Sequence, residues 1–303
     1  MKPMISLAHL TAIDLAPPEL IRLAARTGSD GVGLRLVRVT DTSPGYPLMD
    51  DPAMLRETKA ALKDTGIVVH DIEFIRITPE IDLPPLARVF ETGAELGARH
   101  VITAPYDEDH GRFSQSLGAL ADLAAEFGLG TVMEFFPWTS VPDLATAWEV
   151  VAASGDKAGV LVDMLHFDRS HSRIEDLAKI PPHRLPFMHL CDAPVQPSYT
   201  LEELLQAGRA ERLPPGEGQI DLLSILPRMP AGIPVALEVP MTALTASAGA
   251  ETVLRKVKSA ADGVLKLVEY LSSVNATGNG LEETRSGQGT DVDDFFNQPA
   301  RPE

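Results

Sequence analysis

Eight short apolar runs that alternate with longer amphipathic stretches constrain the fold of this chain more than any other feature of its sequence. The runs are rich in Val, Ile, Leu and Phe without clean alternation, which is typical of parallel strands that are covered on both faces. They span residues 5–7, 32–37, 67–74, 101–104, 131–136, 160–167, 187–190 and 235–239. Segments with helical periodicity lie between them, for example 53–64, 116–127 and 141–153. This order predicts consecutive strand–helix units.

Glycines mark the ends of many of the helical stretches and support the same division. A glycine after a helix takes the left-handed backbone conformation and turns the chain toward the next strand. These glycines are Gly28, Gly66, Gly97, Gly128, Gly155 and Gly232. The units predict a (β/α)8 TIM barrel, whereas a doubly wound sheet would require a glycine-rich phosphate loop after an early strand, which the sequence lacks. We therefore expect a single barrel domain over residues 1–273.

Two segments fall outside the regular pattern. Residues 193–215 lengthen the connection before the eighth strand, are rich in proline, and contain a short helical pattern at 201–211. We expect this connection to be a lid over the substrate or, alternatively, a surface insertion without a role. After a last helix at 251–272, the acidic, Gly- and Asp-rich residues 274–303 lack hydrophobic periodicity, which predicts a disordered tail.

The acidic composition excludes some classes of partner. The chain has 43 Asp and Glu residues against 26 Lys and Arg, a formal net charge of −17. Without a local basic patch, such a chain is repelled by nucleic-acid phosphates and anionic membranes, so we expect neither partner. Cys191 is the only cysteine, and the first residues lack the pattern of a signal peptide. No apolar stretch approaches the length of a membrane-spanning helix, and we expect a cytoplasmic protein.

Four consecutive predicted strands each carry one carboxylate or imidazole group near the end where barrel enzymes have their active sites. These residues are Glu134, Asp163, His189 and Glu238. A single acid or histidine at such a position is more often structural, but burying three carboxylates together is unfavourable without a neutralising positive charge, and no Lys or Arg lies in these runs. One divalent cation would satisfy all four side chains. Oxygen-rich ligation with one imidazole favours Mn²⁺, with Mg²⁺ or Co²⁺ as alternatives.

Five motifs resemble, in order and spacing, those of the xylose isomerase-like barrel family. They are Met-Glu-Phe-Phe (133–136), Val-Asp-Met-Leu-His-Phe (162–167), His-Leu-Cys-Asp (189–192), Pro-Gly-Glu-Gly-Gln-Ile-Asp (215–221) and Leu-Glu-Val-Pro (237–240). The resemblance covers about residues 4–272 and is specific for the family, but not for one activity. The family includes sugar epimerases, hydroxypyruvate isomerase, inosose dehydratase, 3-dehydroshikimate dehydratase and endonuclease IV. It implies a metal-dependent enzyme.

The resemblance also implies roles for individual residues. The four residues named above match the metal ligands of the family, and Glu134 and Glu238 also match its acid–base pair. His166 matches a histidine that contacts a substrate oxygen in several members. Glu217, in the Pro-Gly-Glu-Gly segment, would lie near the site or, alternatively, would be a solvated side chain in a turn.

Proton abstraction beside a carbonyl is the chemistry that such a site performs. A divalent metal polarises the carbonyl and acidifies the neighbouring C–H group. One glutamate removes the proton to give an enediolate, and a second that returns a proton to the other carbon or face makes the enzyme a sugar (phosphate) isomerase or epimerase. If a β-hydroxyl leaves instead, the enzyme is a lyase of the 3-dehydroshikimate or inosose dehydratase type. A phosphodiesterase of the endonuclease IV type would need more histidines at the strand ends. A non-catalytic sugar-binding protein would keep its ligand affinity after the substitutions Glu134→Gln and Glu238→Gln.

Two arginines in the first half of the barrel bear on the charge of the small-molecule substrate. Arg35 lies in the second predicted strand, and Arg76 follows the core of the third. An arginine at the barrel mouth would pair with a carboxylate or phosphate of the substrate, or else with a neighbouring acid such as Glu73. An anionic substrate favours a keto-acid dehydratase or a sugar-phosphate isomerase, and a neutral polyhydroxylated ketone favours an epimerase. Barrels of this kind often form homo-oligomers, but the sequence identifies no interface.

Overall fold

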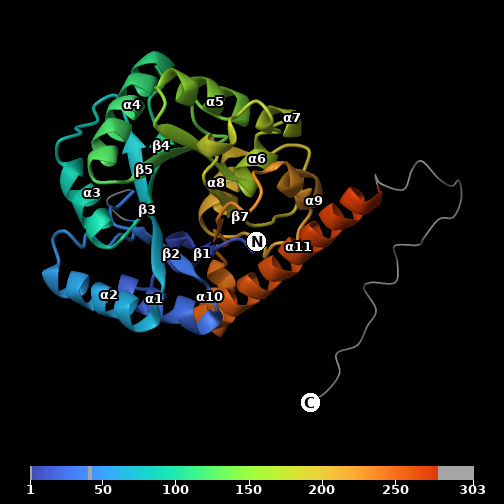
Figure 1. Ribbon diagram of the computed structural model, residues 1–303, viewed down its shortest axis with the longest axis horizontal. Helices are drawn as coiled ribbons and strands as arrows, with labels where there is room; N and C mark the ends of the chain where they lie inside the picture. Colours follow the sequence, from blue (N-terminus) through green and yellow to red (C-terminus); the bar gives the residue numbers. More distant parts are fainter. Residues whose placement is uncertain (1, 40–42, 279–303) are drawn as a thin grey trace, which may run out of the picture.

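The computed structural model describes residues 2–39 and 43–278, and its centre is a closed barrel of eight parallel strands (Figure 1). Each strand pairs with the next along the chain, and β8 pairs with β1 to close the barrel. The strands are β1 (Ile5–Leu7), β2 (Gly31–Arg35), β3 (Val68–Ile77), β4 (His100–Pro105), β5 (Gly130–Glu134), β6 (Ala158–Asp163), β7 (Met188–Leu190) and β8 (Val235–Leu237). The (β/α)8 TIM barrel that the sequence predicts is confirmed.

Helices surround the barrel and connect its strands. The α-helices are α1 (Pro17–Thr27), α2 (Pro52–Thr65), α3 (Leu86–Glu95), α4 (His110–Glu126), α5 (Leu144–Ala153), α6 (Met164–Arg169), α7 (Ile174–Leu177), α8 (Leu201–Arg209), α9 (Leu222–Ile225), α10 (Thr242–Ala248) and α11 (Ala250–Gly278). Short 3-10 helices are η1 (His9–Ala12), η2 (Pro182–Arg184) and η3 (Leu226–Arg228). α1 and α2 end at Gly28 and Gly66, whose φ angles of 79° and 73° are the left-handed turns expected from the sequence.

The strands divide the apolar core into two layers. A small buried cluster is formed by residues in or next to the last five strands, namely Ile102, Val132, Leu161, Phe187 and Ala236. Their neighbours along each strand belong instead to a much larger cluster that packs the strands against the helices. The small cluster therefore fills the inside of the barrel. Burial on both faces explains why the apolar runs in the sequence do not alternate.

Strand β3 is irregular, and this irregularity affects which of its side chains face the inside of the barrel. Val69 and Asp71 of β3 pair with adjacent residues of β2, so His70 is an extra residue in the ladder. A second register shift, against β4, follows Ile72. Such bulges interrupt the strict alternation of side chains between the two faces. A side chain at Gly33 would collide with the carboxylate of Asp71, its partner in the ladder.

The sequence predicted that the apolar run at residues 160–167 is one strand. This prediction is wrong. β6 ends at Asp163, and α6 begins at the next residue. The Asp163 carboxylate accepts hydrogen bonds from the backbone N–H groups of Leu165 and His166 at 2.8 and 3.1 Å. This cap satisfies N–H groups that have no partner within the first turn, and it therefore starts the helix inside an apolar run.

Helix α11 runs past the end of the expected last helix and projects beyond the barrel (Figure 1). It continues through residues 274–278, which the sequence analysis placed in the tail, because no proline or glycine interrupts the segment between Gly263 and Gly278. The remainder of the expected disordered tail, 279–303, lies outside the described residues. None of the described helices is both long and apolar enough to cross a membrane.

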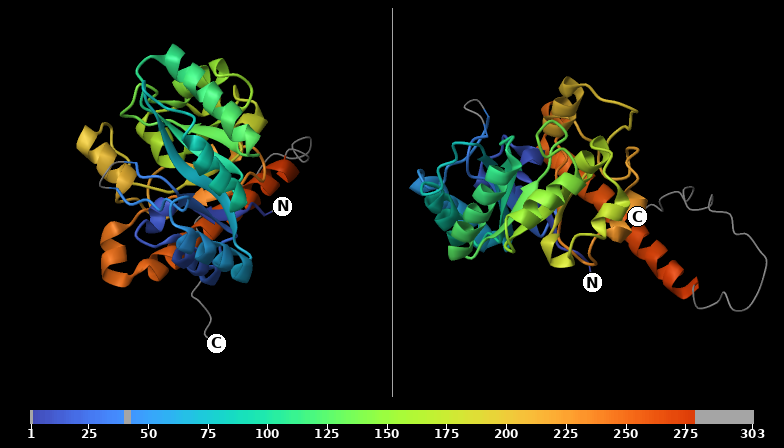
Figure 2. Two further views of the ribbon diagram at one scale, coloured as in Figure 1. Left: turned by 90° about the vertical axis from the view of Figure 1, so that its left-hand side faces the viewer. Right: turned by 90° about the horizontal axis from the view of Figure 1, so that it is seen from above.

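The long connection between β7 and β8 covers the carboxyl ends of the strands. Figure 2 (right) shows α8 on the side of the barrel opposite the N-terminus. A reciprocal cap starts this helix, since Thr200 Oγ1 accepts from the backbone N–H of Glu203 and the Glu203 carboxylate accepts from the N–H of Thr200. After α8, the backbone N–H of Arg212 donates to Pro240 O at 2.8 Å. The connection is thereby attached to the loop that follows β8.

Candidate metal centre

Four side chains from consecutive strands meet at the carboxyl end of the barrel. Glu134 ends β5, Asp163 ends β6, His189 lies within β7, and Glu238 directly follows β8. One potential ligand atom of each lies within 4.8 Å of those of the other three, and all four side chains are buried. The structure thus brings together the four residues that the sequence analysis assigned to a metal ion.

The imidazole of His189 lies among three carboxylates. Its Nδ1 atom is 3.3 Å from Glu134 Oε1 and 3.5 Å from Glu238 Oε2. Asp163 Oδ2 is 3.6 Å from the same nitrogen. Among the described residues, His189 Nδ1 and Glu134 Oε1 have no hydrogen-bond partner although both atoms are buried. Buried polar atoms without partners are rare in folded proteins, and one imidazole with three carboxylates is a donor set that a divalent metal accepts. The cluster could therefore hold one such ion.

Arg212 is a buried cation in direct contact with this cluster. Its Nη1 donates to Asp163 Oδ2 at 2.6 Å, and its Nη2 donates to Glu238 Oε2 at 2.7 Å. Further donation to the backbone oxygens of Glu238 and Gly208 fixes the guanidinium between β8 and α8. The sequence analysis did not identify Arg212, because this residue lies in the connection between β7 and β8 and not in a strand. Its position three residues before the 215–221 motif was the only available signal.

The two glutamates of the cluster have opposite pKa shifts. Burial raises the pKa of Glu134, His189 lowers it, and Glu238 and Asp163 raise it, which gives a net pKa of about 7. Burial also raises the pKa of Glu238, but Arg212 and His189 outweigh burial and hold that pKa below its ordinary value. Near neutral pH, Glu238 is therefore a carboxylate, while Glu134 can exist with or without a proton. Two carboxyl groups with separated pKa values are the usual basis for assigning a proton donor and a proton acceptor.

The two histidines of the site have opposite protonation tendencies. Burial lowers the pKa of His189, but Glu238, Asp163 and Glu134 outweigh burial, and the net pKa lies well above its ordinary value. Burial lowers the pKa of His166 to about 4, and Asp163 only partly opposes it. His166 is therefore neutral near pH 7. Its Nε2 is 3.9 Å from Glu134 Oε1, so the structure brings it to the cluster as expected.

Aromatic rings and α8 enclose His166. Phe136 and Trp138 pack edge-on against its imidazole, with ring centroids 4.8 and 5.2 Å away. Gly208, in the last turn of α8, faces Trp138 so closely that a Cβ atom there would lie 2.8 Å from the indole ring. The absence of a side chain at Gly208 allows α8 to cover the site. That the β7–β8 connection is a lid over the substrate remains a prediction.

Arg35 lies inside the barrel but is not a free cation. Its Nη2 donates to Glu73 Oε2 at 3.1 Å, and both side chains are almost completely buried. Glu73 belongs to the neighbourhood of the metal ligands: burial raises the pKa of its carboxyl, Arg35 lowers it, and Glu238 raises it. The sequence analysis weighed Glu73 as a partner of Arg76, and the structure pairs Glu73 with Arg35 instead.

Arg76 and Glu217 lie apart from the four-residue cluster. The exposed Arg76 guanidinium lies 4.1 Å from the centre of the Tyr106 ring and donates to Val39 O at 3.2 Å. Glu217 is exposed, and its Oε2 accepts from Lys256 Nζ on α11 at 2.6 Å. The turn that contains Glu217 is held by a buried side chain, because Asp192 Oδ2 accepts a hydrogen bond from the backbone N–H of Gly216 at 2.9 Å. The observed Glu217 contact agrees with the solvated alternative.

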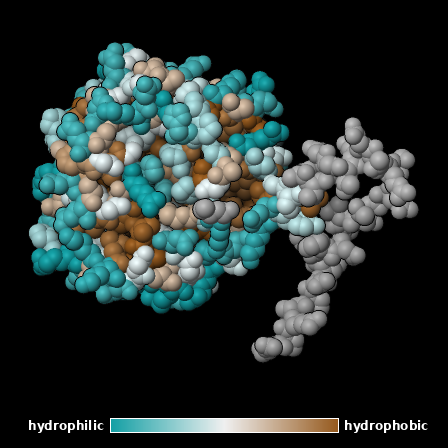
Figure 3. Space-filling view, viewed as in Figure 1, coloured by the Kyte–Doolittle hydropathy of each residue, from teal (hydrophilic) through white to brown (hydrophobic). Residues whose placement is uncertain are grey.

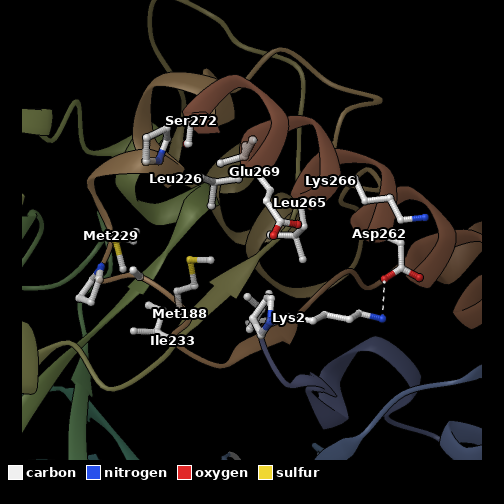
Figure 4. Close-up of a pocket in the computed structure, with 17 residues that line it drawn as sticks. Lys2, Met188, Leu226, Met229, Ile233, Asp262, Leu265, Lys266, Glu269 and Ser272 are labelled. Atoms are coloured by element: carbon white, nitrogen blue, oxygen red, sulfur yellow. Dashed lines mark ion pairs between the residues drawn. The ribbon is translucent and has the colours of Figure 1, made fainter. Parts of the chain in front are cut away.

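A separate groove of about 450 Å³ lies at the opposite end of the barrel, where β7 and β8 begin. It is lined mainly by apolar residues of α11 and of the segment before β8, among them Met229, Ile233 and Leu265 (Figure 4). Lys2 Nζ, at its edge, is 3.6 Å from Asp262 Oδ1. The space-filling view shows apolar side chains gathered beside α11 on this face (Figure 3). None of the four cluster residues lines this groove.

Comparison with known proteins agrees with this geometry. The sequence profile described as xylose isomerase-like TIM barrel matches residues 21–260. The chain belongs to this family. Among curated relatives, an inosose isomerase of Bacillus velezensis is 28% identical over 145 residues, which are 44% of this chain and 50% of that protein. An inosose isomerase of Halalkalibacterium halodurans is 32% identical over 116 residues, 36% of this chain and 39% of that protein. The matches thus span half or less of the length of these relatives.

Solved structures of the family share the fold at low sequence identity. A crystal structure titled IOLI protein with a binding zinc atom has a TM-score of 0.71 and 21% identity, covering 88% of this chain and 99% of that one. The 3-keto-D-glucoside 4-epimerase of E. coli has a TM-score of 0.63 and 18% identity, covering 85% and 100%. The probable 3-DHS dehydratase of Bacillus anthracis has a TM-score of 0.66 and 13% identity, covering 86% and 98%. Both isomerising and dehydrating proteins therefore have this architecture.

Proposed function

We propose that this protein is a divalent-metal-dependent isomerase or epimerase that acts on a polyhydroxylated ketone. The observation that carries the proposal is the buried cluster in which one histidine and three carboxylates converge. The inosose isomerase matches add support from the sequence, and they make inosose the first substrate to test. A metal ion bound there would polarise the substrate carbonyl and acidify the adjacent C–H group.

The side chains divide the remaining work among them. Glu238 is ionised and accepts the proton from the carbon next to the carbonyl, while Arg212 fixes the orientation of its carboxylate. Glu134 returns a proton to the neighbouring carbon or to the other face. The neutral His166 lies beside Glu134 and provides a hydrogen bond to a substrate oxygen. The rings around it and α8 exclude water from the reacting atoms.

The metal and the setting are part of the same proposal. Mn²⁺ is the ion we propose, because three carboxylates and one imidazole are ligands that suit Mn²⁺, whereas structural zinc sites are rich in thiolates. The net charge of −17 opposes binding to nucleic acid, and the absence of a cysteine pair is consistent with the cytoplasm. We also propose that the protein forms a homo-oligomer, which the molecular mass in solution tests.

Deuterium exchange is the experiment that tests the proposal. The Mn²⁺-loaded protein is incubated in D₂O with inosose, a keto-sugar, a sugar phosphate and 3-dehydroshikimate, and product masses are followed. Deuterium uptake without loss of water supports an isomerase or epimerase, whereas loss of one water assigns a dehydratase. Glu134→Gln and Glu238→Gln should each reduce turnover at least a hundredfold. Glu251→Gln, which changes an exposed ion pair, is the matched control and should leave turnover unchanged. Metal binding without exchange on any substrate refutes the proposal.

A further inference from the structure

The Arg35–Glu73 pair has two buried atoms that remain without partners. Arg35 Nε and Glu73 Oε1 have no hydrogen-bond partner among residues 2–39 and 43–278. The Glu73 side chain is only 2% exposed and that of Arg35 only 7%. Leaving a buried charged group with an unsatisfied atom is unfavourable, so a native site of this kind normally has a ligand or water to complete it. The two atoms offer one donor and one acceptor.

The pair lies near the metal cluster, at the same carboxyl end of the barrel. Glu73 lies close enough to Glu238 and His189 for their charges to shift the pKa of its carboxyl group. The Arg35 guanidinium lies 5.4 Å from the centre of the Phe74 ring. Phe74 packs against the small cluster inside the barrel. Its ring lies 6.4 Å from that of Phe136, which in turn contacts His166. Phe74 and Phe136 therefore connect the pair with His166, beside the metal ligands.

The charged groups of the pair and of the cluster are already in contact with groups of opposite charge. Glu73 neutralises Arg35 through an ion pair at 3.1 Å. A divalent ion together with Arg212 would neutralise the three carboxylates of the cluster. No described cation in contact with the cluster is left to balance a phosphate or carboxylate, and an anion would lie beside the Glu73 carboxylate in a site of low dielectric constant.

We propose that Arg35 and Glu73 form a subsite for a hydroxyl group of an uncharged polyhydroxylated substrate, at the end of the molecule remote from the metal. Arg35 Nε donates to the hydroxyl oxygen, and the hydroxyl donates to Glu73 Oε1. Because a hydroxyl is both a donor and an acceptor, it satisfies the two atoms at once, whereas a carboxylate or phosphate oxygen would satisfy Arg35 and repel Glu73. Arg35 thus recognises a neutral group and is not an anion clamp. This inference rests on the proposed function for the orientation of the substrate.

The backbone around the pair is built to hold it. Arg35 and Glu73 are direct partners in the parallel ladder between β2 and β3. Glu73 lies within the second register shift of β3, and its neighbour Phe74 contacts the interior cluster. The backbone N–H of Arg35 donates to His9 Nδ1 at 2.9 Å, which fixes the end of β2. The subsite therefore rests on strands and not on mobile loops, a condition for selective recognition.

Calorimetric titration of the Mn²⁺-loaded protein tests the subsite with two probes, myo-inositol and an inositol monophosphate. The wild type should bind inositol at least tenfold more tightly than the phosphate. Glu73→Gln should weaken inositol binding about tenfold, as expected for one lost hydrogen bond to a charged group, and should improve phosphate binding because Arg35 is released. Glu251→Gln is the control, since it changes an exposed ion pair and should alter neither affinity. The double variant Arg35→Met/Glu73→Met removes both charges with little change of volume, and it should hold Mn²⁺ but lose inositol binding.

The outcomes separate this inference from the proposed function. The inference is overturned if the wild type binds the phosphate more tightly or binds neither probe, or if Glu73→Gln and the double variant both bind inositol as the wild type does. In those cases deuterium exchange with a ketone substrate would still support the proposed function. Conversely, inositol binding that depends on Glu73 but is accompanied by no exchange on any ketone would leave the subsite intact and refute the proposed reaction.

Discussion

Replacing Arg212 by Met tests whether this arginine substitutes for metal charge in the folded protein. Arg212 is 2% exposed and donates at 2.6 and 2.7 Å to the carboxylates of Asp163 and Glu238. Removing one partner of a buried ion pair destabilises a protein by about 3–5 kcal/mol. For a domain of this size that corresponds to a decrease in Tm of roughly 6–20 °C. We therefore expect the metal-free variant to melt at least 6 °C below the metal-free wild type.

The same substitution should have the opposite effect on metal binding. A guanidinium that contacts two of the ligand carboxylates repels a divalent cation, and its removal should increase Mn²⁺ affinity at least tenfold, which is about 1.4 kcal/mol. Saturating Mn²⁺ should then restore much of the lost Tm, while turnover stays low because Glu238 has lost its orienting contact. Calorimetry and thermal melting with and without EDTA measure both effects. Arg255→Met, which removes an exposed guanidinium paired with Glu251, should change Tm by less than about 2 °C. Equal metal-free Tm values for Arg212→Met and wild type, with equal Mn²⁺ affinity, would refute the reasoning.

Three further predictions follow from other contacts. Gly208→Leu should displace α8 from the Trp138 ring, lower kcat/KM at least tenfold and shift Trp fluorescence to longer wavelength; an unchanged spectrum would show that α8 does not cover the ring. Mn²⁺ affinity should rise between pH 5 and 8, because Glu134, with a pKa of about 7, and His189, with a raised pKa, must both lose their protons to become ligands; titration in buffers of different ionisation enthalpy should detect proton release, and a pH-independent affinity would contradict both pKa shifts. Gly33→Ala should destabilise the fold by about 1–3 kcal/mol in urea unfolding because of the collision with Asp71, whereas Gly263→Ala, with open space around it in α11, should stabilise the fold by about 0.5–1 kcal/mol.

The parts of the site that the sequence predicted are those in which the strand itself determines the position of the side chain. Glu134 and His189 lie within apolar runs, so once the barrel was inferred their convergence followed from the fold. Arg212 reaches the same cluster only because the β7–β8 connection folds back and pairs with the loop after β8, and no periodicity in the sequence encodes that path. The helix that begins inside the run 160–167 was missed for a related reason, since the Asp163 cap depends on a side-chain orientation.

The first half of the barrel was less predictable because β3 does not alternate regularly. Two register shifts interrupt the alternation of side chains along β3. Sequence spacing alone therefore could not decide whether Glu73 or Arg76 faces the interior. The structure buries Glu73 beside Arg35 and leaves Arg76 on the surface against Tyr106. A pairing of Glu73 with an arginine was stated from the sequence for Arg76, and only the observed distance shows that Arg35 is the partner.

Asp163 uses its two oxygens for different purposes, and this has a kinetic consequence. Oδ1 caps α6 at Leu165 and His166, while Oδ2 faces His189 and Arg212. Fraying of the first turn of α6 would let this carboxylate rotate, and rotation would remove one ligand from the cluster. The dissociation rate of a bound ion should therefore follow the opening rate of this turn, which amide hydrogen exchange at residues 165 and 166 reports. Asparagine retains the cap and weakens the ligand, whereas glutamate retains the ligand and misplaces the cap, so aspartate is the side chain that serves both purposes.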